Sequence, residues 1–139
     1  MRKLAAIITI SYTLLLFYWM FMGFGRSNRI AMGYSYNVIP FHTLKMYMNH
    51  ADHFDMRTWF INVVGNVAVF VPFGIAIPYL IGIRVIRFTL SFIAALFIIE
   101  FLQLILRRGS FDIDDVLLNT IGAMIGYFVY WILMRIKAE

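Results

Sequence analysis

Two polar side chains interrupt an otherwise apolar stretch of this 139-residue chain. Glu100 is followed three residues later by Gln103, so both would lie on one face of a helix. A carboxylate near the middle of a lipid-exposed helix costs roughly 2.5–3.5 kcal/mol on insertion scales, so Glu100 is predicted to face a bundle interior or a wet cavity. A buried carboxylate of this kind could act as a general base or carry a proton.

A second pattern with chemical content combines polar and small residues at spacings of three and four. Its members are Asp112, Asp115, Asn119, Gly122 and Gly126. On a helix this spacing makes one continuous face, polar at its start and small at its end. Gly122 and Gly126 have the small-xxx-small form that lets membrane helices approach closely, so we interpret them as packing residues.

The composition identifies the environment of these side chains. Hydrophobic residues make up 63% of the chain, charged residues 14%, and the mean hydropathy is +0.83. A soluble domain is roughly half apolar and about a quarter charged. A core of about 140 residues cannot hide this much apolar surface, so the surplus must face lipid. Disorder, a coiled coil and a free soluble enzyme are therefore excluded.

Charge and cysteine content narrow the function further. The net charge is +5, but the basic residues lie at the ends of hydrophobic runs. This placement predicts membrane orientation rather than binding of nucleic acid. The absence of cysteine excludes a disulfide scaffold, a thiolate metal site and a cysteine nucleophile.

Hydropathy predicts an all-α fold, an integral membrane bundle of four transmembrane helices forming a single domain over residues 1–139. Each predicted span is long enough to cross a bilayer core: Leu4–Phe24, Trp59–Ile81, Phe88–Leu106 and Ile113–Met134. A 34-residue polar and aromatic loop, Gly25–Thr58, joins the first two spans and is expected to cap one end of the bundle. The other two connections are short, which predicts that the last three helices are antiparallel neighbours.

Four spans place both termini on one side of the membrane. Each side then carries six lysine and arginine residues, so the positive-inside count does not decide the orientation. The six on the side of the termini lie in three short stretches, whereas four of the opposite six are spread over the long loop. We therefore expect a multi-pass protein with both termini in the cytoplasm.

The buried polar residues fall in one layer of the predicted bundle. At about 1.5 Å per residue, Asn66, Glu100 and Asn119 each lie roughly 9–10 Å inside a span end on the loop side of the membrane. This coincidence predicts one polar cavity that opens towards the loop and the outer leaflet. Its predicted lining consists of Asn66, Glu100, Gln103, Arg108, Asp112, Asp115 and Asn119.

Each of these side chains also has a purely structural interpretation. The asparagines and Gln103 could form interhelical hydrogen bonds worth about 0.6 kcal/mol each. Arg107, seven residues after Glu100, could pair with that glutamate. A histidine and aspartate group in the loop, residues 50–55, is interpreted as solvated loop rather than a metal site. No metal site and no cofactor is predicted.

Four stretches resemble the VanZ-like family of bacterial membrane proteins. They are Asn37–Phe41 (NVIPF), Asn66–Gly74 (NVAVFVPFG), Glu100–Gln103 (EFLQ) and Arg108–Ala123 (RGSFDIDDVLLNTIGA). In the family the arginine often sits nearer the Phe-Asp pair, so Arg107 and Arg108 are both candidate equivalents. The founding member is associated with resistance to the glycopeptide teicoplanin. The resemblance implies a membrane fold and a cell-envelope context, and it implies no particular reaction.

Three functions are compatible with these residues. The first is a binding role in the bacterial plasma membrane, in which the cavity engages a membrane lipid, a lipid-linked cell-wall precursor or an amphiphilic antibiotic. The second is an intramembrane hydrolase or transferase, with Glu100 as the candidate catalytic base and Asp112 and Asp115 holding a divalent cation. No nucleophile is evident for it. The third is a proton-linked transporter or flippase, which four helices could support only as a homo-oligomer.

The predicted orientation can be tested directly because the chain has no native cysteine. With both termini inside, cysteines placed at Asn49 and Gly109 should react with an impermeant thiol reagent in intact cells. A cysteine at Gly82 should react only after permeabilisation. The reverse labelling pattern would move the polar layer to the cytoplasmic side.

Overall fold

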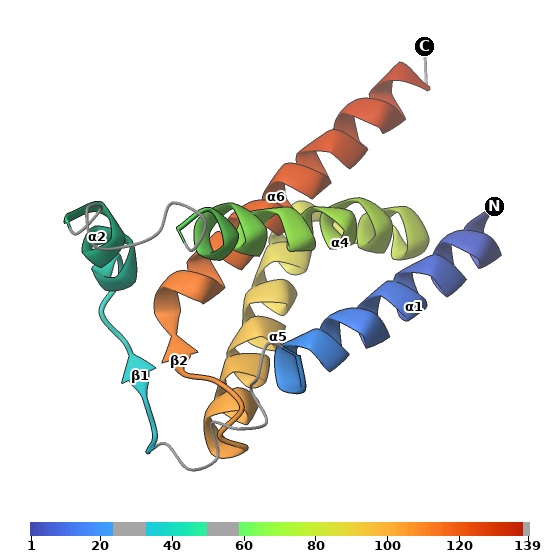
Figure 1. Cartoon of the computed structure of the whole chain (residues 1–139). Coiled ribbons are helices and arrows are strands. Elements are labelled where there is room, and N and C mark those ends of the chain that lie inside the picture. The colour runs from blue at the N-terminus through green and yellow to red at the C-terminus, as the bar shows by residue number, and fades with distance from the viewer. Residues whose placement is uncertain (24–32, 50–58, 138–139) are drawn as a thin grey trace.

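The computed structural model describes residues 1–23, 33–49 and 59–137. Four long helices dominate it (Figure 1). They are α1 (Arg2–Phe21), the π-helical turn η2 (Ile61–Gly65) continued by α4 (Asn66–Ile81), α5 (Val85–Ile105) and α6 (Ile113–Ile136). Each is long and apolar enough to cross a membrane, which confirms the predicted all-α class with four membrane-spanning helices.

Helix ends differ from the hydropathy spans by a few residues. The third helix, α5, begins at Val85 rather than Phe88, because the backbone remains helical through the charged Arg87. The second span ends at Ile81, as predicted, and its C-cap residue Gly82 has a left-handed φ of +65°, which favours glycine. The Gly82 N–H bonds to the carbonyl of Pro78 at 2.9 Å, so the chain turns directly into α5.

The closest packing is between α4 and α6, which are not consecutive in the chain. A Cβ atom at Gly122 would overlap the carbonyl oxygen of Val67, and one at Gly126 would overlap that of Val71. This order of contacts shows that the two helices run parallel, with their backbones touching. Short connections predicted close antiparallel neighbours, but they limit only the distance between helix ends and not which faces pack.

The other two long helices pack on this pair from different sides. Helix α1 contacts α4 through Tyr12, whose hydroxyl donates to the carbonyl of Val69 at 2.8 Å. Helix α5 contacts α6 through Phe88 and Tyr127, whose ring centroids lie 5.3 Å apart. The buried core joins all four helices through Leu16, Phe70, Phe73, Leu96 and Val116.

The described part of the predicted loop is folded. Its strand β1 (Tyr36–Asn37) pairs in parallel with β2 (Phe111–Asp112), and the helix α2 (His42–Asn49) follows β1. These elements lie at one end of the bundle, and the two chain termini lie at the other (Figure 1). The loop therefore covers the end at which α5 finishes and α6 begins.

The glycine contact can be tested with a matched pair of substitutions. Gly126→Ala should lower the free energy of unfolding by roughly 1–3 kcal/mol, because the new methyl group pushes α6 off the α4 backbone. Gly65→Ala is the control, since its Cβ atom would meet nothing within 4 Å. The measurement is the thermal midpoint in detergent, and Gly122→Leu and Gly126→Leu should also reduce folded yield. Equal midpoints for the two alanine variants would contradict the close contact.

Candidate functional site

Asp112 joins the start of α6 to the loop. It is the N-cap residue of α6, and its Oδ1 atom accepts hydrogen bonds from the Asp114 N–H at 2.9 Å and from Asn37 Nδ2 at 3.0 Å. Its Oδ2 atom accepts from the Thr43 hydroxyl at 2.6 Å. Capping satisfies backbone donors that the first helical turn leaves free. Asp112 therefore lies just outside the helix, which corrects the prediction that it belongs to the continuous polar face of α6.

Asp114 is a structural residue that the sequence analysis passed over. Only 1% of its surface is exposed, and its carboxylate accepts hydrogen bonds from the backbone N–H groups of Phe41, Thr43 and Leu44. The Thr43 and Leu44 bonds measure 2.9 and 3.2 Å. It thus caps the N-terminus of α2 from another part of the fold, where a negative charge is favoured. Three aspartates within four residues were the available signal, but helical spacing selected Asp112 and Asp115 and left Asp114 out.

Glu100 and Asp112 meet at this end of the bundle. The Glu100 side chain is 3% exposed, and its Oε2 atom accepts a hydrogen bond from the backbone N–H of Asp112 at 3.2 Å. The carboxylate from the α5 helix therefore reaches the first residues of α6. A carboxylate this deeply buried needs such partners, because burial without them is expensive.

The α4 and α6 helices bring two further predicted residues together. Asn66 Nδ2 donates a hydrogen bond to Asp115 Oδ1 at 2.7 Å. One turn later on α6, Asn119 is only 2% exposed. Its side-chain Oδ1 atom is buried and accepts no hydrogen bond from the residues that the structure describes. A buried amide oxygen without a donor is rare in folded proteins, so this atom needs an explanation.

Gln103, Arg107 and Arg108 lie close together in the chain but have different surroundings. Gln103 is 2% exposed and donates from Nε2 to the backbone carbonyl of Met20 at 2.8 Å, which ties α5 to the end of α1. The α5 helix ends at Ile105, and Arg107 has a left-handed φ of +52°. Helical spacing therefore does not extend to Arg107, whose guanidinium lies 4.8 Å from the ring centroid of Tyr34. Arg108 is half-buried beyond the helix end.

The contacts described above join the loop, α4, α5 and α6 at one end of a bundle of four apolar helices. Residues 7–134 match the profile of the VanZ/LLP1 family. The chain belongs to that family. No curated protein and no solved structure matches it.

The polar residues of this VanZ/LLP1 protein do not form an evident metal centre. Within residues 1–23, 33–49 and 59–137, no three histidine, aspartate or glutamate side chains are grouped as metal ligands. Both carboxylate oxygens of Asp112 are already used by Asn37, Thr43 and Asp114. The histidine and aspartate group at residues 50–55 lies outside the described residues.

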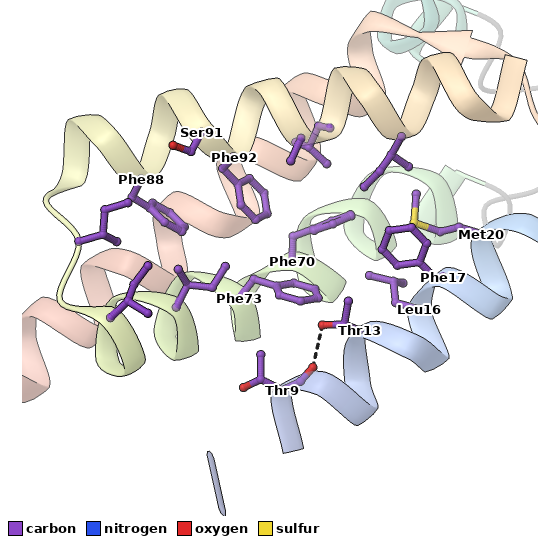
Figure 2. Close-up of a pocket in the computed structure, with 16 residues that line it drawn as sticks. Thr9, Thr13, Leu16, Phe17, Met20, Phe70, Phe73, Phe88, Ser91 and Phe92 are labelled. Atoms are coloured by element: carbon purple, nitrogen blue, oxygen red, sulfur yellow. Dashed lines mark hydrogen bonds between the residues drawn. The ribbon is translucent and has the colours of Figure 1, made fainter. Parts of the chain in front are cut away.

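An apolar cavity of about 480 Å³ lies between α1, α4 and α5 of this VanZ/LLP1 protein (Figure 2). Phe70 and Phe73 project into it from α4, and Phe88 and Phe92 from α5. In the view of Figure 2, Phe88 and Met20 lie at opposite ends of the lining. The backbone carbonyl of Met20 accepts the Gln103 hydrogen bond, so the cavity reaches the level of the polar residues.

The Asp114 cap yields a prediction about the loop. Asp114→Ala removes the acceptor of three backbone N–H groups, which should lower the free energy of unfolding by roughly 1–3 kcal/mol and loosen α2. The exposed Lys45 lies in α2, so limited trypsin digestion should cleave there faster than in the unmodified protein. Asp114→Asn keeps one acceptor oxygen and should give an intermediate rate. An unchanged rate in Asp114→Ala would show that other contacts hold α2.

Proposed function

We propose that this protein acts in the bacterial cell envelope by binding an amphiphilic or lipid-linked ligand at the loop end of the bundle. The proposed headgroup site, called here the polar cluster, consists of Asn66, Glu100, Gln103, Arg108, Asp112, Asp115 and Asn119. With the termini in the cytoplasm, the polar cluster lies at the level of the outer leaflet. The candidate ligands are a membrane lipid, a lipid-linked cell-wall precursor and an amphiphilic antibiotic.

The observation that carries this proposal is the buried acceptor on Asn119. An amide oxygen in a protein interior almost always accepts a hydrogen bond, because an unmatched one costs about 1–3 kcal/mol. The Asn119 oxygen has no donor among the described residues. A ligand that brings an N–H or O–H group would satisfy it.

The charges of the polar cluster indicate what kind of headgroup fits. Glu100 and Asp115 supply carboxylates from α5 and α6. Arg108, in the segment between these two helices, supplies a guanidinium. Carboxylates near the hydrocarbon layer favour a cationic partner, and the arginine favours an anionic one. A zwitterionic or amino-sugar headgroup has both features. Where its cation is an ammonium group with N–H bonds, the headgroup also carries donors for the Asn119 oxygen.

Two further considerations support binding rather than the alternatives. Membership of the VanZ/LLP1 family accords with a role in the cell envelope, where lipids and wall precursors are abundant. In the hydrolase hypothesis Asp112 would hold a cation, but its two oxygens accept hydrogen bonds from an amide, a hydroxyl and a backbone N–H. A cation would have to displace these structural bonds. Among the residues that the structure describes, no contact specific to a transport mechanism favours the flippase hypothesis.

Substitution of Glu100 tests the headgroup site. Glu100→Gln retains the shape and an oxygen that can accept the Asp112 N–H, but it removes the charge. Folded yield should stay level or rise, since a buried charge is lost. Expression of the unmodified chain in a susceptible bacterium should alter the inhibitory concentration of teicoplanin, and Glu100→Gln should abolish this effect. Glu100→Asp, shorter by one methylene, should retain part of it.

If the role of Glu100 is only structural, the same substitution should change the folded yield in the opposite direction. If Glu100 is one half of a buried ion pair, Glu100→Gln should strand a charge and lower the free energy of unfolding by about 3–5 kcal/mol. Folded yield would then fall, and Arg108→Gln in the same chain would restore it. That outcome would defeat the headgroup site.

A further inference from the structure

We propose that the cavity between α1, α4 and α5 holds one hydrocarbon chain of the same amphiphile whose headgroup binds the polar cluster. This inference rests on the proposed function and adds to it the chemical class of the ligand. The ligand is then a lipid or lipid-like molecule with a headgroup that donates hydrogen bonds and a single chain inserted between helices.

The lining of the cavity is suited to a hydrocarbon chain. Aliphatic and aromatic side chains from three helices form nearly all of it, and its polar members are Thr9, Thr13 and Ser91. The Thr9 hydroxyl donates to the carbonyl of Ala5 at 2.8 Å, and the Thr13 hydroxyl donates to that of Thr9 at 2.7 Å. Both donors are therefore used within α1, as the dashed line between Thr13 and Thr9 shows in Figure 2. A polar ligand would find little to bind here.

The size of the cavity matches a single chain. An engineered apolar cavity of about 150 Å³ accommodates one benzene molecule, which has six carbon atoms. By that scale the cavity of about 480 Å³ has room for roughly three times as many carbons, about 18. Along α5 it extends from Phe88 to Ile99, roughly 16 Å at the helical rise, which is about half of a bilayer core. The volume and length of the cavity therefore fit one hydrocarbon chain of a lipid from a single leaflet.

The environment of the cavity favours an occupant of this kind. An unfilled apolar void forfeits the dispersion contacts of every side chain around it, and water does not settle in a site without polar partners. Phe17, Ser91 and Ala95 line the cavity and are exposed, so it opens to the surface between α1 and α5. Because this surface belongs to membrane-spanning helices, a lipid chain can enter sideways from the bilayer.

The position of the cavity links the chain to the headgroup site. Met20 and Ile99 both line it. Met20 is held by the Gln103 hydrogen bond, and Ile99 directly precedes Glu100. A chain lying in the cavity would therefore leave its polar end beside Glu100 and Gln103. One molecule can occupy both sites.

Photocrosslinking of the full chain in lipid vesicles tests this inference. The probe is phosphatidylethanolamine with a diazirine at the end of one acyl chain, and labelled residues are mapped by peptide mass spectrometry. The unmodified protein should be labelled at the deep lining residues Ile77 and Phe88. Ala95→Trp should reduce that labelling roughly fivefold or more, because the indole occupies the cavity. The control is Ala94→Trp, an exposed neighbour outside the lining, which should leave it unchanged.

A second pair of variants keeps the test valid if Ala95→Trp fails to fold. Ser91→Phe places a smaller ring in the cavity, and Leu90→Phe is its control on the lipid-facing side. Equal labelling of filled and control variants would overturn the inference. Labelling confined to exposed residues such as Leu90 and Ile98 would also overturn it.

Phosphatidylcholine with the same diazirine separates the chain site from the headgroup site, because its headgroup has no N–H donor. The combined proposal expects weaker labelling by this probe. Equal labelling by both lipids, still sensitive to Ala95→Trp, would reject the headgroup site and leave the cavity. A teicoplanin effect that depends on Glu100, without labelling of the cavity, would reject the chain site and leave the proposed function.

Discussion

The backbone contact between α4 and α6 determines the arrangement of the other elements. In a bilayer, apolar side chains gain nothing by leaving lipid for each other, so helices associate through close packing and polar bonds. Gly122 and Gly126 allow the carbonyl oxygens of Val67 and Val71 to occupy the space that side chains would fill. This contact fixes the two parallel helices in one register. It thereby brings Asn66 within hydrogen-bond distance of Asp115.

The carboxylates at the start of α6 have different tasks although they are neighbours in the chain. Asp112 and Asp114 bind Asn37, Thr43 and the backbone at the start of α2, so they hold the loop against the bundle. Glu100 and Asp115 come from the membrane-spanning part of α5 and α6, and we propose that they contact the headgroup. The loop that Asp112 and Asp114 hold lies at the same end of the bundle.

The polar cluster and the apolar cavity are complementary in chemistry and adjacent in position. The α4 and α6 helices pack tightly, whereas α1, α4 and α5 enclose a space of about 480 Å³. The close packing of α4 against α6 holds the fold of this small bundle. The space between α1, α4 and α5 leaves room for an apolar chain. Binding of one amphiphile across both regions accounts for the unmatched acceptor on Asn119 and for the cavity together. It also agrees with membership of a membrane family without requiring a catalytic nucleophile.

The sequence by itself determined the membrane class and the four helices, because hydropathy acts locally along the chain. The energetic penalty of a buried polar group also predicted that Glu100, Gln103 and Asn119 are buried, as the structure shows. The spacing of Gly122 and Gly126 also predicted that these glycines pack against another helix. Only the tertiary structure decided that α4 and α6 are the tight pair and that Asp114 caps α2. Spacing assumes an unbroken helix, so it extended the faces of α5 and α6 to Arg107 and Asp112, which lie just outside the helix ends. The cavity was equally invisible to the sequence, since its lining comes from three helices whose separation depends on how their faces pack.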